Sequence, residues 1–317
     1  MQLPAKTLVY IASTNRSGST LLGSLLGIHS GLSMVGEFHH LHSYLNQGAY
    51  GRIYDYRCSC REKVSDCPFW RAVLDAAGLT DRTALTRVRS GTSSVRRNLA
   101  YPWYCVAGEA RIAKDLRREL ARSVNARQAA DTCYRILDKA CETSGRQVVV
   151  DTSKRVEQAL ALIHFKPSDW AIRIVHLLRD PRGNADSLVR RARENGAKGS
   201  FSGACLYWVR ENRRFLVLGR QLGAEEYFLL RYEDLCSKPE QHLRAICSFI
   251  GIAYEPRMLE GNPVVMHDIG GSPRKLDYDQ GIQIRLDERW QGSMTPCRKL
   301  AYAVIARRLA RRFGYQY

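Results

Sequence analysis

Four stretches of nearly continuous apolar residues recur along the 317-residue chain: TLVYIAS (7–13), QVVVDTS (147–153), AIRIVHLLRD (171–180) and YFLLRYEDL (227–235). Runs of this kind are typical of strands that are buried on both faces, as in a parallel sheet. Helical patterns follow several of them, at 19–29, 184–195 and 239–250. This alternation of strand and helix predicts a layered α/β fold with a central, mostly parallel sheet.

The region from about 44 to 145 departs from that alternation. It is long, carries cysteines and arginines, and is interpreted as an α-rich insertion in a single domain that covers residues 1–317. No internal repeat or low-complexity linker divides the chain.

No stretch of about 18 or more apolar residues is present, which argues against a transmembrane helix. The N-terminus enters the first apolar run within a few residues, and no small-residue cleavage site follows that run. These features predict a cytoplasmic protein, in which a reducing environment would keep most of the ten cysteines as thiols.

The charge balance of 49 basic to 31 acidic residues gives a net charge of +18. This excess favours anionic partners such as a phosphorylated cofactor, nucleic acid, an acidic glycan or a membrane surface, although a generally basic proteome would produce it too. The tail at 298–317 could form a basic amphipathic helix on a membrane or a phosphate backbone. Alternatively, Leu300, Ala303, Val304 and Leu309 would pack that helix on the sheet. No nucleic-acid-binding motif accompanies the tail, so no nucleic-acid partner is predicted.

Three cysteines, Cys58, Cys60 and Cys67, lie within CSCREKVSDCPFW. They could form part of a zinc site with Cys105 or a histidine as the fourth ligand. Their spacing differs from the common paired C-x2-C arrangement, however, and a local disulfide or packed thiols would also account for the cluster. No metal ligand is therefore assigned from the sequence.

The first apolar run leads into STNRSGSTLLGSLLGIHSG (13–31). A glycine-containing turn before a helix presents backbone N–H groups and the positive end of the helix dipole to an anion. Arg16, Ser17, Gly18, Ser19 and Thr20 would supply that cradle. The first glycine and the lysine of a nucleoside-triphosphatase loop are missing, which counts against an ATP-dependent kinase.

A second candidate phosphate site lies in HLLRDPRGNADSLVRR (176–191). Arg179 ends a predicted strand, and Ser187 follows in the next helix, so the two side chains could converge on one phosphate. A plain strand–loop–helix connection with solvated arginines is the alternative interpretation.

Together these two motifs resemble the sulfotransferases that use 3′-phosphoadenosine 5′-phosphosulfate. RSGSTLL resembles the family's 5′-phosphosulfate loop, LLRDPRGNADSLVRR resembles its 3′-phosphate site, and VVVDTSKR, DERW and RRFGY resemble further segments. The last loop reads GGSPRK where the family usually has G-N-P-x-R, and it supplies Arg274 as a further donor-binding candidate. The resemblance implies a P-loop-like, three-layer α/β/α fold.

The resemblance also implies roles for single residues. Arg16 and the loop amides would bind the 5′-phosphosulfate, and Arg179 with Ser187 would bind the 3′-phosphate. Lys154 would lie near the bridging oxygen or the sulfonate. A hydroxyl, or less often an amine, would attack sulfur in line, with positioned cations and N–H groups in place of a metal ion.

A general base is expected in MVGEFHHLHS (34–43). Glu37 resembles the base position of related branches of the family, and His39 and His40 are alternatives because histidine titrates close to neutral pH. No H-E-x-x-H helix supports a metal site there. The insertion at about 44–145 would form much of the acceptor pocket, for a sugar, lipid, peptide or small natural product. An ATP-dependent kinase and a non-catalytic polyanion-binding protein remain the alternatives.

Overall fold

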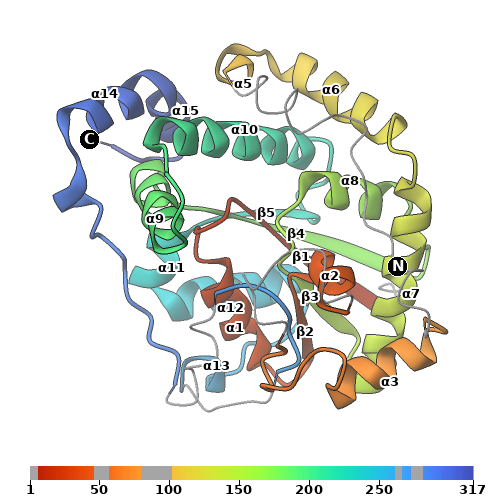
Figure 1. Ribbon diagram of the computed structural model, residues 1–317. Helices are drawn as coiled ribbons and strands as arrows, with labels where there is room; N and C mark the ends of the chain where they lie inside the picture. Colours follow the sequence, from red (N-terminus) through yellow and green to blue (C-terminus); the bar gives the residue numbers. More distant parts are fainter. Residues whose placement is uncertain (1–5, 46–56, 80–101, 261–265, 273–280, 317) are drawn as a thin grey trace.

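A single parallel sheet forms the centre of the computed structural model, which describes residues 6–45, 57–79, 102–260, 266–272 and 281–316. Its strands are β1 (Lys6–Ser13), β2 (Leu32–Gly36), β3 (Val148–Asp151), β4 (Trp170–Leu178) and β5 (Tyr227–Arg231). They lie in the order β2-β3-β1-β4-β5, and every described pairing between them is parallel (Figure 1). The predicted parallel sheet is thus confirmed.

The central strand β1 explains why the apolar runs are nearly continuous. Leu8 and Tyr10 belong to the core on one face of the sheet, whereas Val9 and Ile11 belong to the core on the other face. All four side chains are fully buried. Because successive residues of a strand point to opposite faces, a strand covered on both sides needs apolar residues at every position.

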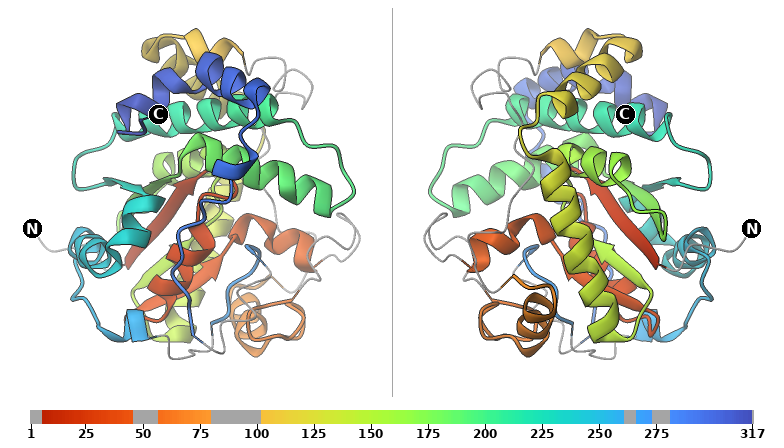
Figure 2. Two further views of the ribbon diagram at one scale, coloured as in Figure 1. Left: turned by 90° about the vertical axis from the view of Figure 1, so that its left-hand side faces the viewer. Right: turned by 90° about the vertical axis from the view of Figure 1, so that its right-hand side faces the viewer.

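Helices cover both faces of the sheet, as the two side views in Figure 2 show. One face is covered by α7 (Ala126–Ser144), α8 (Val156–His164) and α10 (Phe201–Gly219), with α3 (Pro68–Ala76) and α6 (Glu109–Ala121) packed on them. The other face is covered by α1 (Ser19–Gly27), α11 (Tyr232–Ser237), α12 (Pro239–Ile250) and α13 (Arg257–Glu260). This arrangement confirms the three-layer α/β/α fold.

Shorter or peripheral elements complete the described chain. They are η1 (Phe38–His40), α2 (Leu41–Leu45), α5 (Trp103–Val106), α9 (Pro181–Glu194), η5 (Gln291–Ser293), α14 (Pro296–Ile305) and α15 (Arg307–Arg312). Within the described part of 44–145, α7 contacts β2 and β3 directly and shares one apolar core with α3 and α6.

Two boundaries expected from the sequence are wrong. The strand predicted over 227–235 ends at Arg231, and α11 begins at Tyr232. Glu233 and Asp234 occupy the first turn of α11, where carboxylates are favoured by the helix dipole. The single helix expected at 298–317 is divided into α14 and α15, with Ala306 between them.

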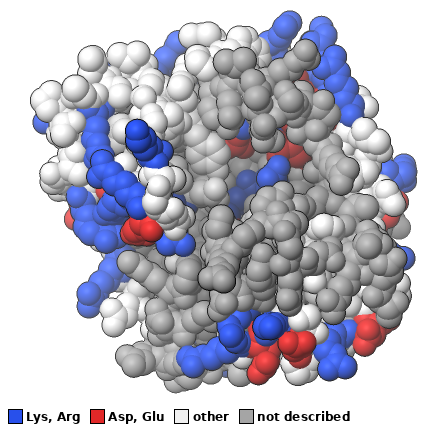
Figure 3. Space-filling model, in the orientation of Figure 1, with Lys and Arg blue, Asp and Glu red and all other residues white. Residues whose placement is uncertain are grey.

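The C-terminal helices pack only in part through the residues expected. Leu309 is buried as expected, together with Tyr302 and Ala306, in a cluster with α9 and α10, whereas Leu300 and Val304 are 66% and 76% exposed. Contact of this exposed face with a membrane stays a prediction. Among the described residues, no helix combines the length and apolarity needed to cross a bilayer. Basic side chains gather on the side of the molecule where Figure 1 draws α9 (Figure 3).

Candidate active site

The candidate site residues follow the carboxyl ends of the five parallel strands. Arg16 lies in the loop after β1, Glu37 follows β2, Lys154 follows β3, Arg179 follows β4 and Tyr232 follows β5. The carboxyl ends of parallel strands meet at one edge of a sheet, which is where open α/β folds bind their ligands. Residues far apart in the sequence are therefore brought together here.

The loop between β1 and α1 adopts a conformation that few side chains tolerate. Arg16 has a φ of 69° and Gly18 a φ of 91°, both in the left-handed region. A Cβ atom on Gly18 would lie 2.4 Å from Cδ2 of Tyr232, so glycine is required both by the backbone and by the neighbouring ring. The loop directs the chain into α1 at Ser19, and the first-turn N–H groups of that helix can bind an anion.

Two hydroxyl groups hold this loop in place. The Ser17 Oγ atom lies 2.7 Å from Thr14 Oγ1 and accepts a hydrogen bond of 3.2 Å from the Asn184 side-chain amide in α9. The Thr20 hydroxyl accepts a hydrogen bond of 3.1 Å from the Ser272 N–H. These bonds tie the loop to α9 and the start of α1 to residue 272.

Arg179 and Ser187 both reach this loop. The Arg16 Nε atom donates to the Ser187 hydroxyl over 3.0 Å, and Arg179 donates to the Arg16 carbonyl over 2.9 Å. The Arg179 guanidinium also lies over the Tyr232 ring, 4.8 Å from its centroid. Arg16 and Ser187, which lie 171 residues apart in the sequence, are therefore adjacent in space.

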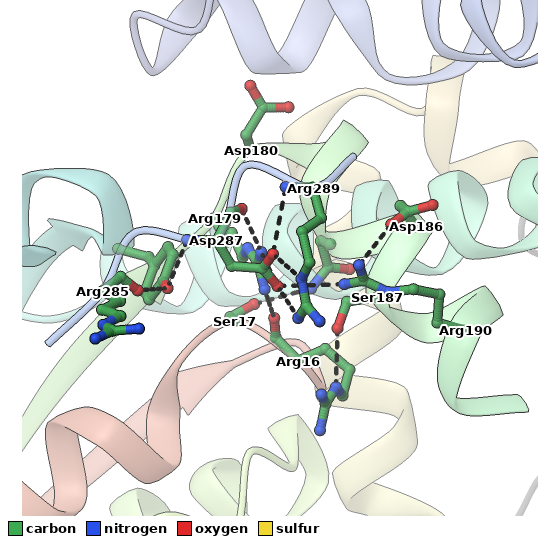
Figure 4. Close-up of polar contacts among 12 residues, drawn as sticks. Arg16, Ser17, Arg179, Asp180, Asp186, Ser187, Arg190, Arg285, Asp287 and Arg289 are labelled. Atoms are coloured by element: carbon green, nitrogen blue, oxygen red, sulfur yellow. Dashed lines mark hydrogen bonds and ion pairs between the residues drawn. The ribbon is translucent and has the colours of Figure 1, made fainter. Parts of the chain in front are cut away.

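A carboxylate lies among three guanidinium groups at the same place (Figure 4). The Asp287 side chain pairs with Arg179 at 3.2 Å, Arg190 at 3.2 Å and Arg289 at 2.7 Å. The hydrogen bond from Arg289 and the charge of Arg179 hold the pKa of Asp287 below its usual range, although partial burial opposes the shift. Three cations around one anion form a site suited to a doubly charged group such as a phosphate.

A second group of charges lies at the first turn of α1. Lys154, which has a φ of 62°, donates to Glu37 Oε1 and to the Ser19 hydroxyl, the latter over 3.2 Å. The Lys154 and Glu37 side chains are only 7% and 10% exposed. Burial disfavours the carboxylate, but Lys154 and His40 outweigh burial and hold the pKa of Glu37 below its usual range.

The two histidine candidates lie beside Glu37. His40 Nε2 is 3.5 Å from Glu37 Oε2, and the rings of His39 and His40 are 3.7 Å apart at 40°. Burial and the neighbouring His40 lower the pKa of His39 well below its usual value, so the His39 imidazole is neutral at pH 7. Glu37, His39 and His40 could jointly face a cation, yet Lys154 already supplies the positive charge at this carboxylate.

The segment 266–272 lies against Glu37. The Glu37 N–H donates to the Ile269 carbonyl over 2.6 Å, and the Ile269 N–H donates to the Val35 carbonyl over 3.1 Å. A Cβ atom on Gly36 would lie 2.2 Å from the Ile269 oxygen, so this close approach requires glycine. Arg274, the remaining donor-binding candidate, lies outside the described residues.

Sequence reasoning assigned no role to Arg190, Asp287 or Arg289, although all three lie in segments that resemble the family, the last two in DERW. Arg190 carries a usable signal, because it lies three residues after Ser187 in α9 and therefore on the same face of the helix. Asp287 and Arg289 lie in an irregular segment between residues 281 and 290, where no periodic pattern indicates which side chains point inward.

Comparisons with known proteins identify relatives of this arrangement. The sequence profile described as "Sulfotransferase family" matches residues 9–256. The sulfotransferase domain from the Synechococcus PCC 7002 olefin synthase is 22% identical, with a TM-score of 0.59 over 100% of this chain and 97% of that chain. The sulfotransferase domain from the curacin biosynthetic pathway is 18% identical, with a TM-score of 0.54 over 100% and 99% of the two chains. No curated protein matches this chain in sequence. The structural likeness confirms the P-loop-like fold.

Proposed function

This chain belongs to the sulfotransferase family, and from that premise we propose that it transfers a sulfuryl group from 3′-phosphoadenosine 5′-phosphosulfate to a hydroxyl group of an acceptor. One observation carries the proposal. Two separate cationic sites contact residues 16–19: Lys154 contacts Ser19 at the first turn of α1, and Arg179 of the arginine cluster around Asp287 contacts the Arg16 carbonyl. A nucleotide that carries both a 5′ and a 3′ anionic group needs two such sites.

The 5′-phosphosulfate is assigned to the loop between β1 and α1. The N–H groups at the start of α1, the Arg16 guanidinium and the Lys154 ammonium would neutralise its charge. In this proposal no divalent metal is needed to neutralise the charge of the 5′-phosphosulfate.

The 3′-phosphate is assigned to Arg179 and Ser187, with Arg190 and Arg289 beside them. In the structure the N–H groups of these arginines bind the Asp287 carboxylate. We expect a 3′-phosphate to take over several of these charge-assisted hydrogen bonds, which are the stronger kind. Because 5′-AMP and ATP lack that phosphate, this cluster would select the bisphosphorylated nucleotide.

Glu37 is assigned as the general base. The donor supplies the sulfuryl group, and its bridging oxygen takes up the electron pair of the broken S–O bond while the acceptor oxygen bonds to sulfur. Glu37 would accept the proton of the acceptor hydroxyl, and Lys154 would stabilise negative charge on the bridging oxygen or the sulfonate. Lys154 must therefore move its hydrogen bond from Glu37 to the donor. This leaves the Glu37 carboxylate free to accept the proton and brings the Lys154 ammonium to the sulfuryl group.

The acceptor pocket is assigned to the insertion at about 44–145. Its first residues follow directly on His40 through α2, and its cysteine-bearing loop contacts residues 266–268 of the segment that lies against Glu37. This part of the chain is thus close to the proposed base. The chemistry of the site fits a hydroxyl on a carbohydrate, a lipid or a small natural product.

A transfer assay tests the proposal. The protein is incubated with 3′-phosphoadenosine 5′-phosphosulfate and a metabolite extract, and products are screened by accurate mass for the gain of SO₃. We expect SO₃-bearing products with the wild type. With Arg179→Ala we expect none when the donor concentration is kept low, because this variant should bind the donor weakly.

ATP with Mg²⁺ in place of the sulfuryl donor is the matched control. Products that gain a phosphoryl group from ATP, without any SO₃ gain from the sulfuryl donor, would refute the proposal in favour of a kinase. Binding of nucleic acid without transfer to any component would refute it in favour of a polyanion-binding protein.

A further inference from the structure

A cluster of sulfur and nitrogen ligands lies apart from the donor-binding residues. Cys58, Cys60 and Cys67 come from one loop, and His267 comes from a segment about 200 residues further along the chain. One ligand atom from each of the four residues lies within 4.8 Å of all the others. The sequence alone gave no means of choosing His267 among eight histidines.

The distances between these atoms match a tetrahedral metal site. Zn–S bonds of about 2.3 Å and Zn–N bonds of about 2.0–2.1 Å place neighbouring ligand atoms roughly 3.5–3.8 Å apart around a tetrahedron. The Cys60 and Cys67 sulfurs are 3.6 Å apart, and His267 Nδ1 lies 3.3 Å from Cys67 Sγ and 3.9 Å from Cys58 Sγ. A small displacement of each side chain would therefore suffice to enclose an ion.

We propose that Cys58, Cys60, Cys67 and His267 bind one structural zinc ion. Three thiolates and one imidazole form a soft ligand set that suits Zn²⁺ and excludes Mg²⁺ and Ca²⁺, which prefer oxygen. Four protein ligands fill the tetrahedron, so no open position is left for a substrate, and the ion acts on structure and not on the reaction.

The surroundings hold the ligands in position. The Cys58 and Cys67 side chains are fully buried. The His267 ring stacks on Phe69 with centroids 5.0 Å apart and an interplanar angle of 11°. Trp70 donates its indole N–H to the His267 carbonyl over 2.7 Å, which fixes the backbone from which the imidazole projects. Both contacts restrict the orientation of His267.

The cysteine loop folds back on itself around the first two ligands. The Cys58 N–H donates to the Glu62 carbonyl over 2.8 Å, and the Arg61 N–H donates to the Cys58 carbonyl over 2.9 Å. Arg61 has a φ of 73°, which lets the chain reverse within a few residues. This tight turn brings Cys58 and Cys60 onto the same side of the loop as Cys67.

The zinc ion would join this loop to the segment that positions the general base. The Ser59 N–H donates to the Asp268 carbonyl over 3.1 Å, and the Asp268 N–H donates back to the Ser59 hydroxyl over 3.1 Å. The next residue, Ile269, accepts the hydrogen bond from the Glu37 N–H. We therefore expect loss of zinc to lower thermal stability and to loosen the backbone that carries Glu37.

Cys105, the alternative fourth ligand from the sequence, lies elsewhere. It is part of α5 and packs with the apolar cluster of α10 and the C-terminal helices. Cys105→Ser is therefore a matched control for cysteine loss outside the site.

The test measures bound metal in the full chain. Protein is produced in zinc-supplemented medium and purified without chelators, and zinc per chain is determined by elemental mass spectrometry. We expect about one zinc per chain in the wild type and in Cys105→Ser, and a loss of most of it in Cys67→Ser and His267→Ala. Cobalt substitution of the wild type should give the visible absorption of a tetrahedral thiolate site, a readout that needs no variant.

Three results would overturn the proposal. Wild-type protein without zinc would do so, as would an intramolecular disulfide between two of the three loop cysteines found by peptide mapping. Zinc retained in both Cys67→Ser and His267→Ala would show that other residues hold it. None of these readouts depends on sulfuryl transfer, so the outcome is independent of the proposed function.

Discussion

Replacing Glu37 with glutamine tests the assignment of the general base. Glutamine keeps the size of the side chain and one oxygen that can accept the hydrogen bond from Lys154, but it cannot take up a proton at neutral pH. Removal of a general base typically lowers the rate about 10²–10⁴-fold. The affinity for 3′,5′-bisphosphoadenosine should stay within about threefold of the wild type, because the Glu37 carboxylate accepts from Lys154, which in turn donates to Ser19, and is itself assigned no contact with the donor.

The buried ion pair adds a second effect that must be separated from the first. The Lys154 and Glu37 side chains are 7% and 10% exposed, so Glu37→Gln leaves a buried ammonium without its counter-ion. Breaking a buried pair in this way costs about 3–5 kcal/mol. The double variant Glu37→Gln, Lys154→Met removes both charges and should recover much of the lost thermal stability, while its turnover stays low.

The assay compares turnover, nucleotide affinity and melting temperature for Glu37→Gln, His39→Ala and His40→Ala side by side. We expect Glu37→Gln alone to lose turnover by at least about 100-fold with folding intact. Normal turnover in Glu37→Gln together with an inactive histidine variant would assign the base to that histidine and refute our reasoning.

The same pair predicts how stability and turnover depend on pH. Because the folded-state pKa of Glu37 lies below its unfolded value of about 4.3, the pair stabilises the fold above that pH and loses its effect as the pH falls further. Transfer of the Lys154 hydrogen bond to the donor should raise the pKa of Glu37 in the complex. The acid limb of kcat should then lie at higher pH than that of kcat/KM, and coincident limbs would contradict the transfer.

Three further predictions concern the loop, metal ions and a buried histidine. Gly18→Ala should weaken nucleotide binding by at least about tenfold, because its Cβ would meet the Tyr232 ring. Gly78 has a similar positive φ of 65° but open space around it, so Gly78→Ala should lower stability by only about 1 kcal/mol and leave nucleotide binding unchanged. Calorimetric titration of both variants with nucleotide compares them. Transfer should continue at full rate without Mg²⁺ and in brief exposure to a chelator, whereas strict dependence on Mg²⁺ would favour a kinase. Burial lowers the pKa of His176, which bonds Tyr227 and Asn212, to about 4, so stability should fall as the pH drops from about 6.5 toward 4; His176→Gln should reduce this slope in melting curves, and an unchanged slope would contradict it.

The strands could be predicted from the sequence because burial on both faces leaves a strong apolar signal. β2 escaped notice, since its five residues LSMVG are short and follow α1 after only a brief turn. The end of β5 was misplaced because the apolar Tyr232 and Leu235 prolong the run, although the chain has already turned into α11. Both errors arise where tertiary packing decides the boundary between elements.

The candidate site was predictable only where its residues lie in local motifs. Arg16 and Arg179 stand at strand–helix turns that a single sequence reveals, Ser187 follows in the helix after the second turn, and Lys154 follows a strand. Asp287, Arg289 and His267 come from irregular segments whose position depends on long-range contacts. DERW resembles a segment of the family, but nothing in its local pattern shows where Asp287 and Arg289 lie relative to the sheet.

The selectivity of nucleotide binding tests the central claim most directly. Calorimetry with the wild type should show that 3′,5′-bisphosphoadenosine binds at least about tenfold more tightly than 5′-AMP, since one hydrogen bond to a charged group contributes about 1.5–3 kcal/mol. Arg179→Ala should remove most of that preference, whereas Arg244→Ala, which breaks an exposed ion pair on α12, should keep it. Equal affinity of the wild type for the two nucleotides would contradict the assignment of this protein as a sulfotransferase that uses the bisphosphorylated donor.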